Sequence, residues 1–100
     1  MNKQRRKELM KIACSLTMTT TKEQVEDFIN DIENLKFEEE IFYNNAPENL
    51  QYSRRYMDSE DAINYMDDAL DYLNSALECE GDKFKANIND AIEELRRAAI

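Results

Sequence analysis

The chain has 100 residues, enough for one domain with a modest hydrophobic core. A single glycine and a single proline argue against turn-rich β-sandwiches and barrels. Acidic residues outnumber basic ones by 22 to 13, and the resulting net charge of −9 disfavours direct binding to nucleic acid or to an anionic membrane.

The first predicted helix covers residues 2–17. Leu9, Ile12 and Leu16 recur at spacings of three and four residues, which places them on one face of a helix. This segment is also basic, because Lys3 to Lys11 holds five basic residues and one acid. We expect these cations to pair with acidic residues across the fold; contact with nucleic acid is the alternative.

A second helix is predicted over residues 22–44, after a break in the threonine-rich segment 17–21. β-Branched threonines weaken a helix, and either Thr20 with Glu23 or Thr21 with Gln24 would form a capping box that starts a new one. One bent helix is the rival interpretation. Apolar residues predict the buried stripe of the second helix: Val25, Phe28, Ile29, Ile32, Leu35 and Phe42.

Residues 45–58 form the one long predicted connection. Pro47 ends the preceding helix because it restricts the residue before it. Leu50 and Tyr56 are expected to pack this connection onto the helices, and Asp58 or Ser59 is expected to cap the next helix.

Two further helices are predicted over residues 59–80 and 83–99. Pairs of Ala and Ile or Leu recur every seven residues at Ala62, Ala69 and Ala76, and the pattern returns at Ala91. Such a heptad seam faces a partner helix, and its small alanines permit close approach. We expect a turn at Gly81, with the glycine ending one helix and Asp82 capping the next; a continuous helix is the alternative.

These elements predict an all-α fold, a single antiparallel bundle of three or four helices over residues 1–100. Extra apolar surface at the heptad seam would be buried in a homodimer.

Three features together resemble a protein family. They are the basic start at residues 1–9, the segment from Pro47 to Tyr56 (PENLQYSRRY), and the heptads that follow it. The chain looks like the small acidic coiled-coil proteins of phages and prophages of Gram-positive bacteria, although it departs from them at residues 17–21 and 80–82. The resemblance implies an accessory protein without assigned chemistry. Many small acidic phage proteins occupy a host protein, defence nucleases included, and by analogy the same is expected here.

Catalytic machinery is not expected. The chain has no histidine, so the common proton shuttle near neutral pH is missing, and one glycine cannot form a phosphate-binding loop. Adjacent carboxylates could hold a metal, but known bundle sites also use histidine. We therefore expect no enzyme activity, no cofactor and no metal site.

Two groups of residues are the candidate partner-binding sites. Rows of carboxylates on helices can imitate phosphates and enter a basic groove made for nucleic acid; an ordinary solvated face is the simpler alternative. Tyrosine and arginine are frequent at binding hot spots, although they could instead pack the connection. The acidic group consists of Glu38, Glu39, Asp67, Asp68 and Asp71, and the second group of Tyr52, Arg55 and Tyr56.

The expected partner is a host protein, such as a nucleic-acid-binding nuclease, with no direct contact to nucleic acid or membrane. Cys14 and Cys79 are the only cysteines, and we expect two buried, reduced thiols. The basic start is not followed by an apolar run, so no signal peptide is expected and the cytoplasm of a host cell is the predicted location.

Overall fold

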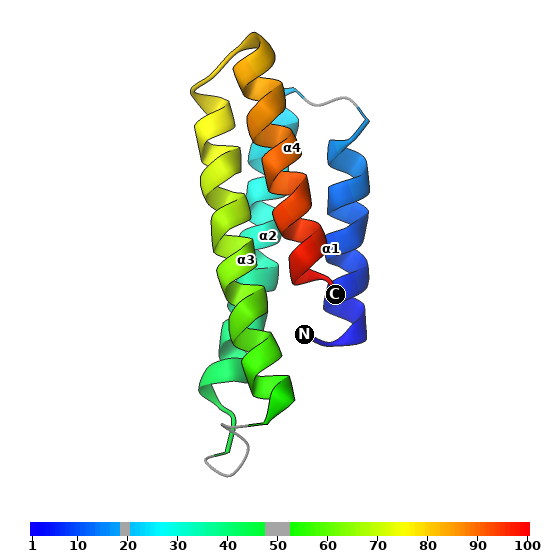
Figure 1. Cartoon of the computed structure of the whole chain (residues 1–100), viewed down its shortest axis with the longest axis vertical. Helices are drawn as coiled ribbons and strands as arrows, with labels where there is room; N and C mark the ends of the chain where they lie inside the picture. Colours follow the sequence, from blue (N-terminus) through cyan, green and yellow to red (C-terminus); the bar gives the residue numbers. More distant parts are fainter. Residues whose placement is uncertain (19–20, 48–52) are drawn as a thin grey trace.

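The computed structural model describes residues 1–18, 21–47 and 53–100. Within these ranges the chain forms four helices and no strands, so the predicted all-α class is confirmed (Figure 1). The principal extents of the molecule are 49 × 20 × 18 Å. The helices are α1 (Lys3–Leu16), α2 (Lys22–Asn44), α3 (Arg54–Leu77) and α4 (Gly81–Ala98).

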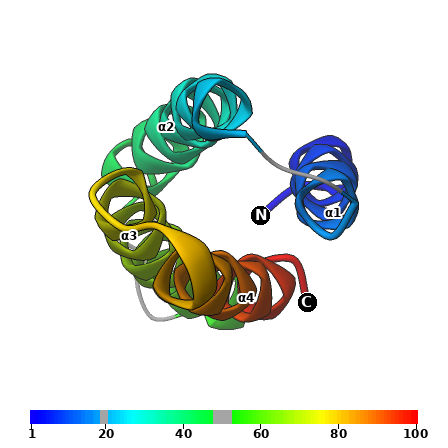
Figure 2. The same ribbon diagram turned by 90° about the horizontal axis from the view of Figure 1, so that it is seen from above.

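Helices that follow each other in the chain lie side by side and run in opposite directions (Figure 1). Seen along the bundle, they follow a ring in the order α1, α2, α3, α4, and α1 stands somewhat apart (Figure 2). The contact between α3 and α4 is the most extensive, and that between α1 and α2 is the least extensive of the neighbouring pairs.

The predicted heptad seam is buried inside this single chain. Ala62, Ala69 and Ala76 are buried on α3, and they belong to the same core as Ala91 and Leu95 of α4. The small alanine side chains let the two helices approach closely. A homodimer therefore cannot use this seam unless the bundle opens.

The predicted break in the threonine segment is confirmed, and Thr21 begins the second helix. Its hydroxyl accepts a hydrogen bond from the backbone N–H of Gln24 at 3.2 Å, and the Gln24 side chain accepts one from the backbone N–H of Thr21 at 2.9 Å. This is a capping box, which satisfies two amides that the first helical turn leaves unpaired.

The predicted start of the third helix at residue 59 is wrong by five residues. The Ser53 hydroxyl accepts a hydrogen bond from the backbone N–H of Tyr56 at 3.2 Å, so α3 begins at Arg54. Asp58 and Ser59 lie inside the helix and do not cap it. Pro47 is the residue in this connection that strongly disfavours a helix, and no residue after Ser53 prevents one from forming. The predicted anchor Leu50 lies outside the described residues.

The predicted turn between α3 and α4 is confirmed, but its residues differ in role. Helix α3 ends at Leu77, and Gly81 is the first residue of α4 with φ +61°, so it does not terminate a helix. Glu80, and not Asp82, occupies the N-cap position, without a side-chain hydrogen bond. Glycine adopts a positive φ without the steric cost other residues meet, so the chain reverses just before it.

Two predictions of burial are wrong. Cys14 is exposed, and Cys79 is half-buried, with its sulfur accepting a weak hydrogen bond from Asn87 at 3.6 Å. Phe42 is 41% exposed and does not belong to the core stripe of α2. Phe42 lies at the edge of the apolar stripe of α2, where the exact placement of the neighbouring helices decides exposure, whereas Cys14 lies on the side of α1 away from its buried residues.

Candidate protein-binding surface

Glu39, predicted as an exposed acid that binds a partner, is fully buried. Its Oε2 accepts a hydrogen bond from Arg5 Nε at 2.9 Å. Its Oε1 accepts one from the Ser59 hydroxyl at 2.8 Å and lies 3.0 Å from the Met1 ammonium nitrogen. A carboxylate can leave water only when its oxygens are satisfied in this way. Glu39 is thus a structural residue that ties α1, α2 and α3 together, and the prediction of a binding role for it is wrong.

The same contacts confirm part of the expectation for the basic start of the chain. Arg5 does pair across the bundle, as the sequence suggests. The cations Lys3, Arg6, Lys7 and Lys11 are exposed, and none of them forms an ion pair with a described residue.

Asp67 faces α2 and is partly neutralised there. Its carboxylate pairs with the Lys36 ammonium, which also lies 3.5 Å from Glu40. The hydrogen bond to Asp67 and the negative charges around it raise the pKa of Lys36, although partial burial opposes this. Lys36 therefore stays charged near neutral pH and marks where α2 and α3 meet.

Glu38 and the α3 aspartates do not form one cluster. Glu38 lines a shallow groove between α1 and α2, together with Glu8 and Lys11 of α1. Asp68 and Asp71 are exposed on α3. The structure therefore separates two parts of the predicted acidic surface.

A larger acidic surface runs along α2 and α3. On α2, Glu26 and Glu33 are seven residues apart, which puts them on one side of the helix about 10.5 Å apart along its axis. Asp71 of α3 and Glu78, the residue that caps the C-terminus of this helix, have the same spacing. Because Lys36 meets Asp67, one further turn places Glu33 opposite Asp71 on the antiparallel helix. We call this surface the α2–α3 acidic face, and its exposed members are Glu26, Glu33, Asp68, Asp71 and Glu78.

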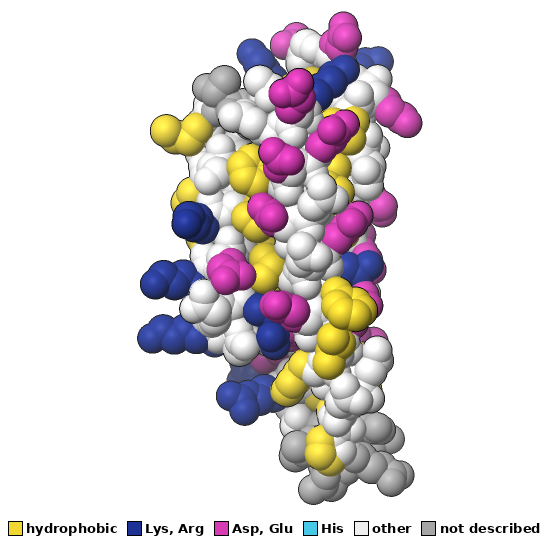
Figure 3. Space-filling view, turned by 180° about the vertical axis from the view of Figure 1, so that it is seen from behind, with side chains coloured by type: hydrophobic (Ala, Val, Ile, Leu, Met, Phe, Trp, Pro, Cys, Tyr) yellow, Lys and Arg dark blue, Asp and Glu magenta, His cyan; other side chains and the backbone are white. Residues whose placement is uncertain are grey.

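Exposed hydrophobic side chains interrupt this face. Phe37 is 63% exposed and Ile41 is 46% exposed, and they lie one turn apart on α2, with Glu33 one turn before Phe37. Figure 3 shows this side of the molecule, where acidic side chains spread over the upper part and hydrophobic ones gather lower down. The sequence patterns did not mark Phe37 and Ile41 as candidate binding residues. They could have been recognised as exposed, because neither lies on the face of α2 that carries the buried residues.

Two of the three residues in the second predicted group, Arg55 and Tyr56, lie in the described part of the chain. Tyr56 stacks on Tyr43, with ring centroids 4.2 Å apart and planes 12° from parallel. The neighbouring Tyr56 hydroxyl, partial desolvation and the charge of Glu60 raise the pKa of Tyr43 to about 12. Tyr56 thus joins α2 to α3, which is the structural alternative for this residue. Tyr52 lies outside the described residues, and Arg55 is exposed.

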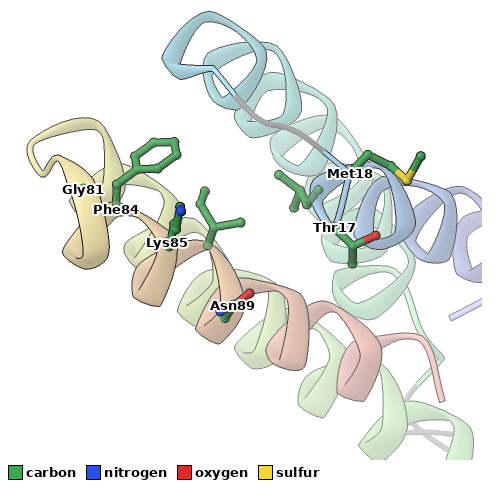
Figure 4. A pocket seen from close by; sticks show the side chains of 8 residues that line it. Thr17, Met18, Gly81, Phe84, Lys85 and Asn89 are labelled. Carbon is green, nitrogen blue, oxygen red and sulfur yellow. The ribbon is translucent and has the colours of Figure 1, made fainter.

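A groove of 610 Å³ lies between the end of α1 and the start of α4. Leu16, Phe84 and Ile88 give it apolar walls, and Figure 4 shows Phe84, Lys85 and Asn89 of α4 across from Thr17 and Met18. The groove separates the upper ends of α1 and α4.

No protein-family model, curated protein or solved structure matches the chain. Within the described ranges, no group of three or more His, Cys, Asp or Glu residues is placed to hold a metal ion. None of the helices seen in these ranges combines the length and apolar character needed to cross a membrane.

Proposed function

We propose that this protein is a non-enzymatic binding protein that occupies a partner protein through the α2–α3 acidic face. The partner class that fits best is a protein with a basic groove made for nucleic acid, such as a host nuclease. This is the role expected of a phage accessory inhibitor. The observation that carries the proposal is the exposure of Phe37 and Ile41 beside carboxylates that form no ion pair within the described part of the chain.

The charge on this face is available to a partner. Glu26, Glu33, Asp68, Asp71 and Glu78 form no ion pair with any described residue. Exposed charges contribute little to folding, so their clustering on one side is not explained by stability. A field of one sign steers a positively charged groove towards the protein and orients it.

Phe37 and Ile41 can supply binding energy that the charged residues alone do not provide. A desolvated aromatic side chain near the centre of an interface is a common source of binding energy, whereas rim charges mainly set specificity and association rate. Phe37 would insert into the partner, and the carboxylates around it would meet basic residues there.

A matched pair of double variants tests this proposal. Asp68→Lys with Asp71→Lys reverses two charges three residues apart on α3, and Asp90→Lys with Glu93→Lys makes the same change at exposed positions of α4. Each variant is immobilised and exposed to a host lysate, and captured protein is eluted with duplex DNA.

We expect a DNA-displaceable partner to be retained by the α4 variant, lost by the α3 variant, and weakened at least tenfold by Phe37→Ala. Retention by the α3 variant, or equal loss in both double variants, would refute binding through this face.

The second candidate is a structural or assembly module that associates with itself. Burial of the heptad seam removes its expected interface, but Phe37 and Ile41 offer an apolar alternative on α2. Light scattering at increasing salt distinguishes the two functions. A dimer that persists at high salt and dissociates in Phe37→Glu would favour self-association.

A further inference from the structure

We propose that the pocket beside the N-terminal turn of α1 binds a small phosphorylated ligand of the nucleotide class. This pocket has a volume of 600 Å³ and lies at the end of the bundle where α1 and α3 begin. Its walls include Lys3, Arg5 and Arg6 of α1, Phe42 of α2, and Arg55 and Asp58 of α3.

The cations of this pocket are largely unused by the fold. Arg5 is held by buried Glu39. Lys3, Arg6 and Arg55 are exposed and form no ion pair with a described residue. Asp58 is the one acidic side chain in the lining, and Ile100 at the rim is 92% exposed, so it does not fill the space. The pocket therefore has a local excess of positive charge.

The side chains that line the pocket suit a ligand that carries a phosphate group close to a planar ring. Two guanidinium groups from different helices, Arg6 and Arg55, can each donate paired hydrogen bonds to phosphate oxygens, and Lys3 adds a point charge. Phe42 presents an exposed aromatic side chain in the same lining. Its face offers a stacking surface for a planar base. The volume lies in the range of about 300 to 1,000 Å³ usual for small-ligand sites.

The net charge of −9 does not prevent a phosphorylated ligand from binding in this pocket. Exposed charges are screened beyond about 8 Å at physiological ionic strength. The molecule is 49 Å long, and Glu26 and Glu78 of the α2–α3 acidic face lie towards the other end, near the start of α2 and the end of α3. Residues 1–18 carry five basic side chains and one acid. A mononucleotide meets this local field, whereas a long polyanion would also meet the acidic helices.

Titration calorimetry with AMP at 0.15 M NaCl tests the site, with adenosine and ribose 5-phosphate as companion probes. We expect a dissociation constant for AMP of about 1 mM or lower. Adenosine should bind at least tenfold more weakly, because it lacks the phosphate.

The matched variants reverse the same number of charges inside and outside the pocket. Arg6→Glu with Arg55→Glu should weaken AMP binding at least tenfold, and Lys7→Glu with Lys11→Glu, at exposed positions outside the lining, should weaken it less than threefold. Arg6→Gln with Arg55→Gln repeats the test if the reversed variant does not keep its helical dichroism. The proposal is overturned if AMP does not bind at 5 mM, if adenosine binds as well as AMP, or if both double variants lose the same affinity.

Discussion

At the scale of single residues, Glu39 departs most from what its neighbours in the chain suggest. It stands between Glu38 and Glu40, yet it alone is fully buried, with hydrogen bonds from Arg5 and Ser59. The difference arises because Glu39 points between three helices, where each oxygen finds a donor.

Replacing Glu39 with glutamine should destabilise the fold. The Arg5 guanidinium and the Met1 ammonium would then face a neutral amide in a buried site, which costs about 3 kcal/mol in the free energy of unfolding. Urea denaturation followed by circular dichroism measures this loss. Glu38→Gln, at an exposed position on the same helix, should change stability by less than about 0.5 kcal/mol; equal effects would contradict the role given to Glu39.

Tyr43 should make stability depend on alkaline pH. Its pKa is raised from 10.0 to about 12, so the folded protein holds this proton more tightly than the unfolded chain does. The stabilisation is fully present below pH 10 and is lost as the pH rises through about 12. Phenolate absorbance and dichroism, recorded together, should show the alkaline transition. Tyr43→Phe should flatten the pH dependence between these limits, and Tyr72→Phe should leave it in place.

At the scale of helices, the ends are determined by a few side chains and one backbone angle. Thr21 and Ser53 each accept a backbone N–H in the first turn of the helix that they cap. Gly81 acts differently, since its φ of +61° lets the chain turn back after α3.

Substitution at Gly81 should show how much the positive φ contributes to stability, separately from side-chain packing. A Cβ added there would meet no atom within 4 Å, so any loss comes from the positive φ alone. Gly81→Ala should cost about 1 kcal/mol, and Gly81→Asn should cost less because asparagine tolerates this region. Thermal unfolding of both variants provides the measurement. An alanine variant as stable as the parent would show that the turn adopts another conformation.

At the scale of the whole molecule, α1 is the least firmly attached helix. Its contact with α2 is the least extensive, and the groove at its upper end separates it from α4. The Glu39 contacts hold its other end through Arg5 and Met1. The bundle thus combines a close-packed α3–α4 pair with a helix held mainly at one end.

Hydrogen exchange should reveal this difference. Because α1 can separate without exposing the α3–α4 interface, its amides should exchange about tenfold faster than those of α3 and α4. Exchange followed by mass spectrometry of peptic peptides resolves the two regions. Glu39→Gln should accelerate exchange in α1 more than in α4, and uniform acceleration would indicate one cooperative unit.

Much of the fold could be predicted from local patterns. Leu9, Ile12 and Leu16 mark the buried face of α1, and the alanine heptads mark the α3–α4 contact, because helical periodicity places such residues on one side. Thr21 with Gln24 is equally local, since a capping box spans four consecutive residues. The start of α3 could not be predicted, because several serines and aspartates nearby could each act as a cap.

The sequence by itself determined the helical class and the excess of acids on outer surfaces, and it favoured a break after the first helix over one bent helix. Only the tertiary structure decided that Glu39 is buried while Phe37 is exposed, and that Arg6 and Arg55 share a pocket. The physical reason is that periodicity defines which residues share one face of a helix. Which face meets another helix, and which cations converge from distant parts of the chain, depends on how the helices are placed around the bundle.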